Sequence, residues 1–333
     1  MFKVLTGAMT HFSNIDTMNS RPNRSASQPK HYVELALEQD NQSVMFVENN
    51  NVFNWAEKKS LLEKNNLKYI HATRLNVTDS LDKSERVHHL VLIAKNYDGA
   101  KEINNIISES FRARNENNNE NEVNNFYYVP RTELARIKDI SDNVFIVFCE
   151  LNNPLWSNKR NNIGEKEAKW LELLRKENVI LGVSARDTTL EYKAMNEYFE
   201  GLHVKYGVNM IHLDLNMSHK PEYEYLRFLL NKSVNEQFES NEQQLVAMTP
   251  QQIKQGLMQY FESDVTKSII ENSNKLYDDI ENFKMDLSFK YPSIYDENPE
   301  QKLKELVVEG YKHRGINKLD KDTQRIYKER INH

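Results

Sequence analysis

The sequence contains a single cysteine, Cys149, among 333 residues. One cysteine cannot form an internal disulfide or build a cysteine-based zinc site, and such usage fits the reducing cytoplasm. Long apolar runs are missing too, because none approaches the roughly 20 residues that a helix needs to cross a bilayer. The first residues also lack the apolar stretch of a secretory signal. These absences predict a cytoplasmic protein without a membrane partner.

Glycine is scarce as well, with nine residues in the chain. No Gly-rich phosphate-binding loop is present, which argues against nucleotide binding through backbone amides. The net charge of −5 provides no overall attraction to nucleic acid. We therefore expect any contact with DNA to be indirect or weak, through a local basic patch or a partner protein.

The first two-thirds of the sequence alternates short apolar runs with amphipathic stretches. Continuous apolar runs are typical of strands that are buried on both faces of a parallel sheet. We predict seven strands, at Phe2–Leu5, Val44–Val47, Lys68–Val77, Val87–Ala94, Val144–Cys149, Val179–Ala185 and Met210–Leu215. Strands that alternate with helices indicate an α/β fold, either doubly wound or closed into a barrel. The number of strands favours barrel-like closure.

Helices are predicted between these strands and throughout the last third of the chain. The first group comprises a helix that opens at Gln28–Pro29 and those at Phe53–Lys64, Gly99–Arg112, Gly164–Glu177, Leu190–Tyr206 and Pro221–Leu230. The second group begins at Thr249–Pro250, a good helix start, and continues with Ser263–Asn282, Pro299–Tyr311 and Thr323–Asn332. The polar segments Met18–Pro29 and Asn115–Asn125 are predicted to be loops. We thus expect a β/α barrel over residues 1–235 and a small all-helical region over residues 236–333.

Several motifs occur in a characteristic order. His88–Gly99 resembles the motif "HHLVLLAKN-x-x-G", Phe148–Leu151 resembles "SGCL", and Lys302–Gly310 resembles "YLRELVxEG". Weaker similarities lie at Phe46–Phe53, Lys68–Arg74 and Met210–Pro221. Together these motifs resemble the N-terminal PHP (polymerase and histidinol phosphatase) domain of the bacterial DNA polymerase III alpha subunit, over nearly the whole chain.

The resemblance implies a distorted β/α barrel whose strand ends hold a cluster of divalent metal ions. Carried onto this sequence, the ligand positions of that cluster fall on Gly7, Met9, Glu48, Asn49, Arg74, His88, His89, Cys149, Leu215 and Met217. Glycine, methionine and leucine cannot bind a hard or borderline metal ion. Only His88, His89 and Cys149 remain as weak metal-binding candidates. We therefore expect a degenerate centre with no catalytic residue, no cofactor and no metal-dependent phosphoesterase activity.

Arg74 allows two interpretations. Its guanidinium could replace a bound cation as the positive partner of nearby acids such as Glu48, which would keep the pocket neutral without a metal. Alternatively, Arg74 simply points to solvent at the end of its strand. Neighbouring strand residues face opposite sides of a sheet, so only one of His88 and His89 is expected to face the barrel interior.

A rebuilt metal site is a further possibility, although its residues match no compact ligand motif. The donors available for it are His203, His212, His219 and Asp214.

The resemblance implies a non-catalytic domain or subunit of a replicative DNA polymerase, with a structural or docking role in DNA replication. Its expected partners are a chain that contains the polymerase palm, or other replisome proteins, since the sequence stops where the palm should begin. One alternative is a metal-dependent phosphoesterase or 3′–5′ exonuclease that binds zinc or manganese through rearranged ligands. Another is a stand-alone interaction protein that mimics the host polymerase domain. The Asn-rich composition hints at an AT-rich genome and a phage origin.

Overall fold

The computed structural model describes residues 2–14, 27–82, 84–116, 130–186, 190–225, 245–284 and 298–332. The chain divides into two compact units, Met1–Lys284 and Met285–His333.

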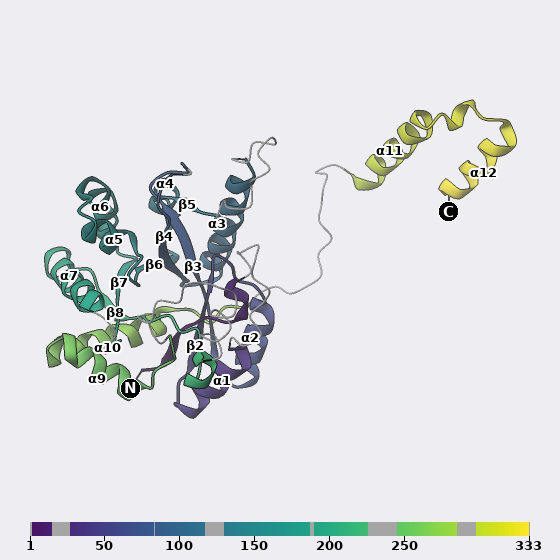
Figure 1. The fold of residues 1–333 in the computed structure, drawn as a ribbon. Helices are drawn as coiled ribbons and strands as arrows, with labels where there is room; N and C mark the ends of the chain where they lie inside the picture. The colour runs from purple at the N-terminus through teal and green to yellow at the C-terminus, as the bar shows by residue number, and fades with distance from the viewer. Residues whose placement is uncertain are drawn as a thin grey trace. The chain divides into compact units, whose positions relative to one another are not determined.

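The first unit is built around one mixed sheet of eight strands, which curls into a distorted half-barrel (Figure 1). Seven strands lie side by side in the order β1 (Val4–Ala8), β2 (Ser43–Asn49), β3 (Lys68–Thr78), β4 (His88–Ala94), β6 (Val144–Phe148), β7 (Val179–Val183) and β8 (Met210–His212). The short strand β5 (Thr132–Glu133) pairs with the end of β3. A parallel bridge between Ala8 and Asn216 links the two ends of the sheet. The amide of Met9 donates to the carbonyl of Asn216 at 2.8 Å there.

All seven predicted strands are confirmed, and their burial explains why the sequence shows them. Every residue of β6 and of β7 is buried, so these strands have no polar face. The expectation of a parallel sheet is wrong at β4, which pairs antiparallel with both β3 and β6. The connection between Thr78 and His88 is shorter than the dozen or more residues that a parallel crossover needs, so the chain turns back directly.

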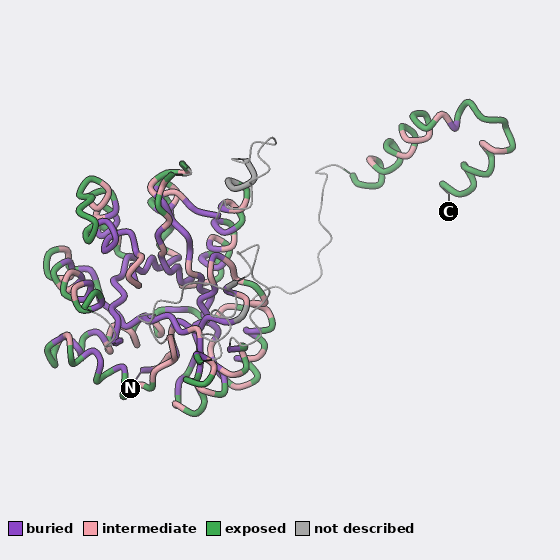
Figure 2. The backbone as a smooth tube through the Cα atoms, viewed as in Figure 1, coloured by how far each residue is buried: buried purple, intermediate pink, exposed green. Residues whose placement is uncertain are grey.

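Helices cover the outside of the curled sheet, and the buried residues gather between the two layers (Figures 1 and 2). They are α1 (Pro29–Glu38), α2 (Trp55–Lys64), α3 (Tyr97–Glu116), α4 (Leu134–Lys138), α5 (Pro154–Arg160), α6 (Gly164–Leu171) and α7 (Leu190–Tyr206). The sequence predicted five of these, and it missed α4 and α5. The helix predicted from Pro221 begins there, although its residues beyond 225 lie outside the described part.

Two helices from the last third of the chain belong to the first unit: α9 (Pro250–Tyr260) and α10 (Ser263–Asp279). The core cluster of the sheet includes Leu276 of α10 and the following Ile280. The Lys68 ammonium at the start of β3 donates to the carbonyl of Tyr277 at 2.7 Å. The compact unit therefore continues past residue 235, the predicted boundary of the barrel, which itself lies outside the described residues.

The second unit contains α11 (Pro299–His313) and α12 (Lys321–Asn332), as the sequence predicted. No residue of α11 is buried. The predicted loops Met18–Pro29 and Asn115–Asn125 lie mostly outside the described residues. No described helix is both long and apolar enough to span a bilayer.

Candidate functional site

One edge of the curled sheet gathers the polar residues that the sequence singled out. Val47, Ala72 and Val91 belong to the interior core cluster. Residues two positions apart on a strand share a face, so Asn49, Arg74 and His89 lie on this same interior face, nearer the edge. Glu150, two residues beyond the end of β6, lies at the same edge. We call the group formed by Asn49, Arg74, His89 and Glu150 the mouth.

Apolar side chains fill the interior beneath the mouth. Met9, Cys149 and Leu215 are buried members of the core cluster, and Met217 packs against it. Burial raises the pKa of the Cys149 thiol well above its usual value, so this side chain stays protonated at neutral pH and offers no thiolate. Three positions where the resemblance expects metal ligands are thus part of the packed core.

At the mouth, the guanidinium of Arg74 joins a carboxylate and an imidazole. Its Nε donates to Oε2 of Glu150 at 2.8 Å. Its Nη2 lies 2.5 Å from Nδ1 of His89, and because arginine has donors only, Nδ1 accepts. The Arg74 side chain is 15% exposed and that of Glu150 is 21% exposed, so the ion pair is shielded yet reachable from solvent.

The charges at the mouth follow from this contact. Burial, reinforced by the positive Arg74, holds the pKa of His89 well below its usual value. His89 is therefore neutral at pH 7. Burial also raises the pKa of Glu150, and Arg74 opposes that rise. The guanidinium thus maintains a carboxylate that burial alone would tend to protonate.

Neither sequence interpretation of Arg74 is fully right. The side chain does pair with an acid, as the first interpretation proposed, but the acid is Glu150 rather than Glu48. It does not simply point to solvent. The sequence did not single out Glu150, which lies two residues beyond the end of β6 and has a positive φ of 63°.

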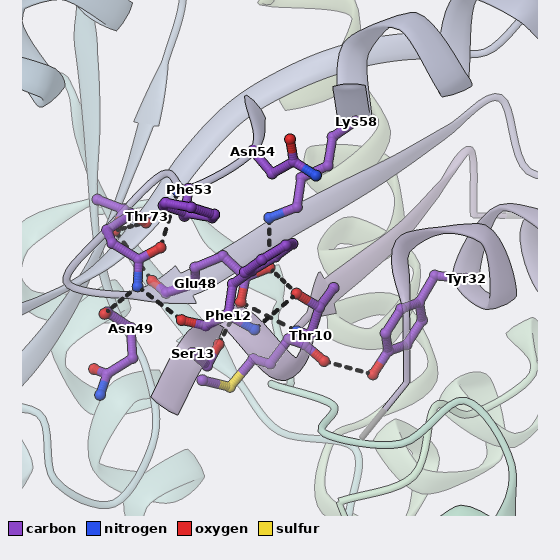
Figure 3. Close-up of polar contacts among 12 residues, drawn as sticks. Thr10, Phe12, Ser13, Tyr32, Glu48, Asn49, Phe53, Asn54, Lys58 and Thr73 are labelled. Carbon is purple, nitrogen blue, oxygen red and sulfur yellow. Dashed lines mark hydrogen bonds and ion pairs between the residues drawn. The ribbon is translucent and has the colours of Figure 1, made fainter. Parts of the chain in front are cut away.

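Glu48 lies in a separate cluster on the outer face of β2, beneath α2. Figure 3 shows Lys58 reaching from its helix toward this carboxylate, with Thr10 and Ser13 beside it. Oε1 of Glu48 accepts from Lys58 Nζ at 2.5 Å and from Thr10 Oγ1 at 2.6 Å. Oε2 accepts from the Thr10 amide at 3.1 Å and from the Ser13 hydroxyl. A carboxylate offers about four lone-pair sites, so Glu48 is fully engaged.

Lys58 is the least expected member of this cluster. Its side chain is 3% exposed and that of Glu48 is 2% exposed. Burial lowers the pKa of Lys58, although Glu48 acts in the opposite direction. The ammonium also lies 5.3 Å from the ring centroids of Phe12 and Phe46. Nothing in the sequence of α2 distinguishes this lysine from the exposed Lys64 on the same helix.

Of the remaining predicted positions, His88 and Gly7 lie away from the mouth, and Asn49 lies in it. His88 faces away from the interior, as expected for one of the two histidines; burial lowers its pKa to about 4, and its Nδ1 has no partner. Gly7 has a φ of 69°, and a Cβ there would meet the Asp214 carbonyl at 2.0 Å. Asn49 has a buried Oδ1 without a hydrogen-bond partner.

The rebuilt site considered from the sequence is not assembled. Asp214 accepts a hydrogen bond from Nε2 of His212 at 3.0 Å. Burial opposes ionisation of Asp214, yet His212 and the nearby Arg186 lower its pKa to about 2. His203 and His219 bond elsewhere, to the Val208 carbonyl and to the Ser27 hydroxyl.

The donor set does not fit the metal cluster that the resemblance implies. Among the residues that the structure describes, no group of three or more His, Cys, Asp and Glu side chains is arranged to hold a metal ion. Glu48 has no free lone pair, and Arg74 places a fixed positive charge against the donors of His89 and Glu150. A cation beside a dication is electrostatically unfavourable.

The curled sheet, the helices outside it and the polar mouth at one edge define a barrel-type α/β domain. Comparison with known proteins identifies the family of this domain. The model of the PHP domain family matches residues 19–186, just over half of the chain. The chain therefore belongs to the PHP domain family, and the predicted fold class, a distorted PHP-type barrel followed by helices, is confirmed.

Among solved structures, the chain is similar to a provisionally named metal-dependent phosphoesterase of Bifidobacterium adolescentis. The two share 10% sequence identity with a TM-score of 0.38, over 79% of this chain and 97% of that one. No curated protein matches the sequence.

Proposed function

We propose that this chain is a non-catalytic PHP-type domain of a replicative DNA polymerase, with a structural or docking role in DNA replication and no metal cofactor. The observation that supports the loss of catalysis is the contact of Arg74 with both Glu150 and His89. A fixed cation occupies the donors that a metal ion would need. A PHP phosphoesterase without metal lacks both its Lewis acid and its activated water.

The link to a polymerase rests on the order of the motifs, from His88–Gly99 to Lys302–Gly310. The last of these motifs lies on α11, where Leu303 is 63% exposed, Leu306 is 42% exposed and Val308 is 53% exposed. Apolar side chains that emerge along one helix are typical of a docking surface. The occupant that we propose is a palm-containing polymerase chain from the same genome. A phage origin stays a prediction.

Binding to that partner tests the proposal. The full chain is mixed with the purified palm-containing chain, and the affinity is measured by calorimetry. We expect Leu303→Glu together with Leu306→Glu to weaken binding by about a hundredfold or more, because two apolar contacts become buried charges. Gln301→Glu, an exposed polar position on the same helix, is the matched control and should leave the affinity nearly unchanged.

Two results would contradict this assignment. If the wild-type chain does not bind the palm-containing chain but binds host replication proteins, the chain is instead a mimic of the host domain. If the wild-type chain binds zinc or manganese tightly and hydrolyses a phosphoester, it is an enzyme with rearranged ligands.

A further inference from the structure

The Arg74 guanidinium lies where two potential metal donors converge. Oε2 of Glu150 and Nδ1 of His89 are 3.9 Å apart, and both contact the same guanidinium. A zinc ion lies about 2.0–2.2 Å from each oxygen or nitrogen ligand. One ion could therefore bridge this span with little movement of either side chain.

We propose that Arg74 is an internal cation that closes a latent divalent-metal site, whose donors are Glu150, His89 and the side chain at position 74. The inference rests on the non-catalytic part of the proposed function. It adds that one residue, rather than the loss of every ligand, keeps metal from this part of the mouth. The metal class is zinc or manganese, which accept mixed imidazole and carboxylate ligands.

The donor geometry at the mouth favours metal binding once the guanidinium is removed. Nδ1 of His89 already points a lone pair at Arg74, because arginine has donors only. Oε2 of Glu150 accepts from the same guanidinium. Both donors therefore face the position that an ion would occupy.

The Glu48 cluster makes no comparable site. The four hydrogen bonds to Glu48 use its lone pairs, and its partner Lys58 is almost fully buried. The mouth differs in that Arg74 and Glu150 retain partial exposure, which gives an ion a route from solvent. The inference is therefore specific to position 74.

The test replaces Arg74 by a carboxylate. We expect Arg74→Glu to bind one zinc ion per chain, at least about a hundredfold more tightly than Arg74→Gln, when untagged, chelator-treated full chains are titrated with zinc chloride by calorimetry. Arg74→Gln is the matched control, because it removes the charge without adding a strong ligand. Zinc should also raise the melting temperature of Arg74→Glu, and a chelator should reverse that rise. Adding Glu150→Gln to Arg74→Glu should abolish the gain.

A second variant, Arg74→His, covers the case in which Arg74→Glu misfolds. If either variant is unfolded without metal, folding on zinc addition supports the inference. If both variants bind zinc no better than Arg74→Gln, or fail to fold even with zinc, the inference is wrong. That failure leaves the proposed function intact, whereas tight zinc binding by the wild-type chain contradicts the proposed function itself.

Discussion

Lys58 of helix α2 and Glu48 of strand β2 form a buried ion pair, with 2.5 Å between Nζ and Oε1. The pair joins the helical layer to the sheet at one of the positions where the resemblance to PHP domains expects a metal ligand. Thr10 and Ser13 complete the hydrogen bonding of the carboxylate. The lysine thus supplies the positive charge that this buried acid requires.

Removing Lys58 should destabilise the fold strongly. Lys58→Met leaves the Glu48 carboxylate buried without its cation, which typically costs about 3–5 kcal/mol of unfolding free energy. Urea denaturation followed by circular dichroism measures this cost. Lys193→Met in α7 is the matched control: the Lys193 side chain is 56% exposed and pairs with Glu197, which is 60% exposed, so a loss below about 1 kcal/mol is expected. Equal losses for the two variants would contradict the structural role of the Lys58–Glu48 pair.

Packing of α9 against the sheet can be tested at a glycine. A Cβ on Gly256 would meet the Ala185 carbonyl at 1.9 Å, so Gly256→Ala should force the helix outward and cost roughly 1–3 kcal/mol. Gly201→Ala in α7 has nothing within 4 Å of the added Cβ and should stabilise by about 0.5–1 kcal/mol. Thermal melting of both variants is the measurement. A harmless Gly256→Ala would mean that α9 does not pack on the barrel unit as described.

Stability should fall as the solution is acidified below neutral pH. Burial lowers the pKa of His71 and of His88 to about 4, whereas an unfolded histidine titrates at about 6.5. Between these values the unfolded state binds more protons, so the unfolding free energy decreases as pH falls from about 6.5 to 4. Each histidine contributes on the order of 1–3 kcal/mol. His71→Gln should flatten this slope in urea titrations; an unchanged slope would show that His71 is not buried in the neutral form.

Much of the fold could be predicted because its strands are buried on both faces. Such strands are continuous apolar runs that need no tertiary information. The direction of β4 could not be read from its apolar run, since the pattern is the same in either direction. Helix α5 was missed because it has 7 residues, of which Pro154 to Asn158 are all buried, so it is too short to show an amphipathic period.

The candidate site was less predictable, because its contacts join distant residues. Arg74 was identified as an unusual residue, but its partner Glu150 is 76 residues away in sequence and lies beyond β4. Lys58 looks like any surface lysine until the structure shows its side chain buried between α2 and β2. The presence of an arginine at position 74 could suggest that a protein cation replaces the metal. Only the packing shows which acid pairs with Arg74 and which with Lys58.

The metal content of the wild-type chain tests the central claim most directly. Untagged protein is equilibrated with zinc and manganese, desalted, and analysed by inductively coupled plasma mass spectrometry. With Arg74 engaged by Glu150 and His89, and Glu48 by Lys58, we expect far less than one ion per chain. One or more ions per chain, retained on desalting and removed by a chelator, would contradict the account.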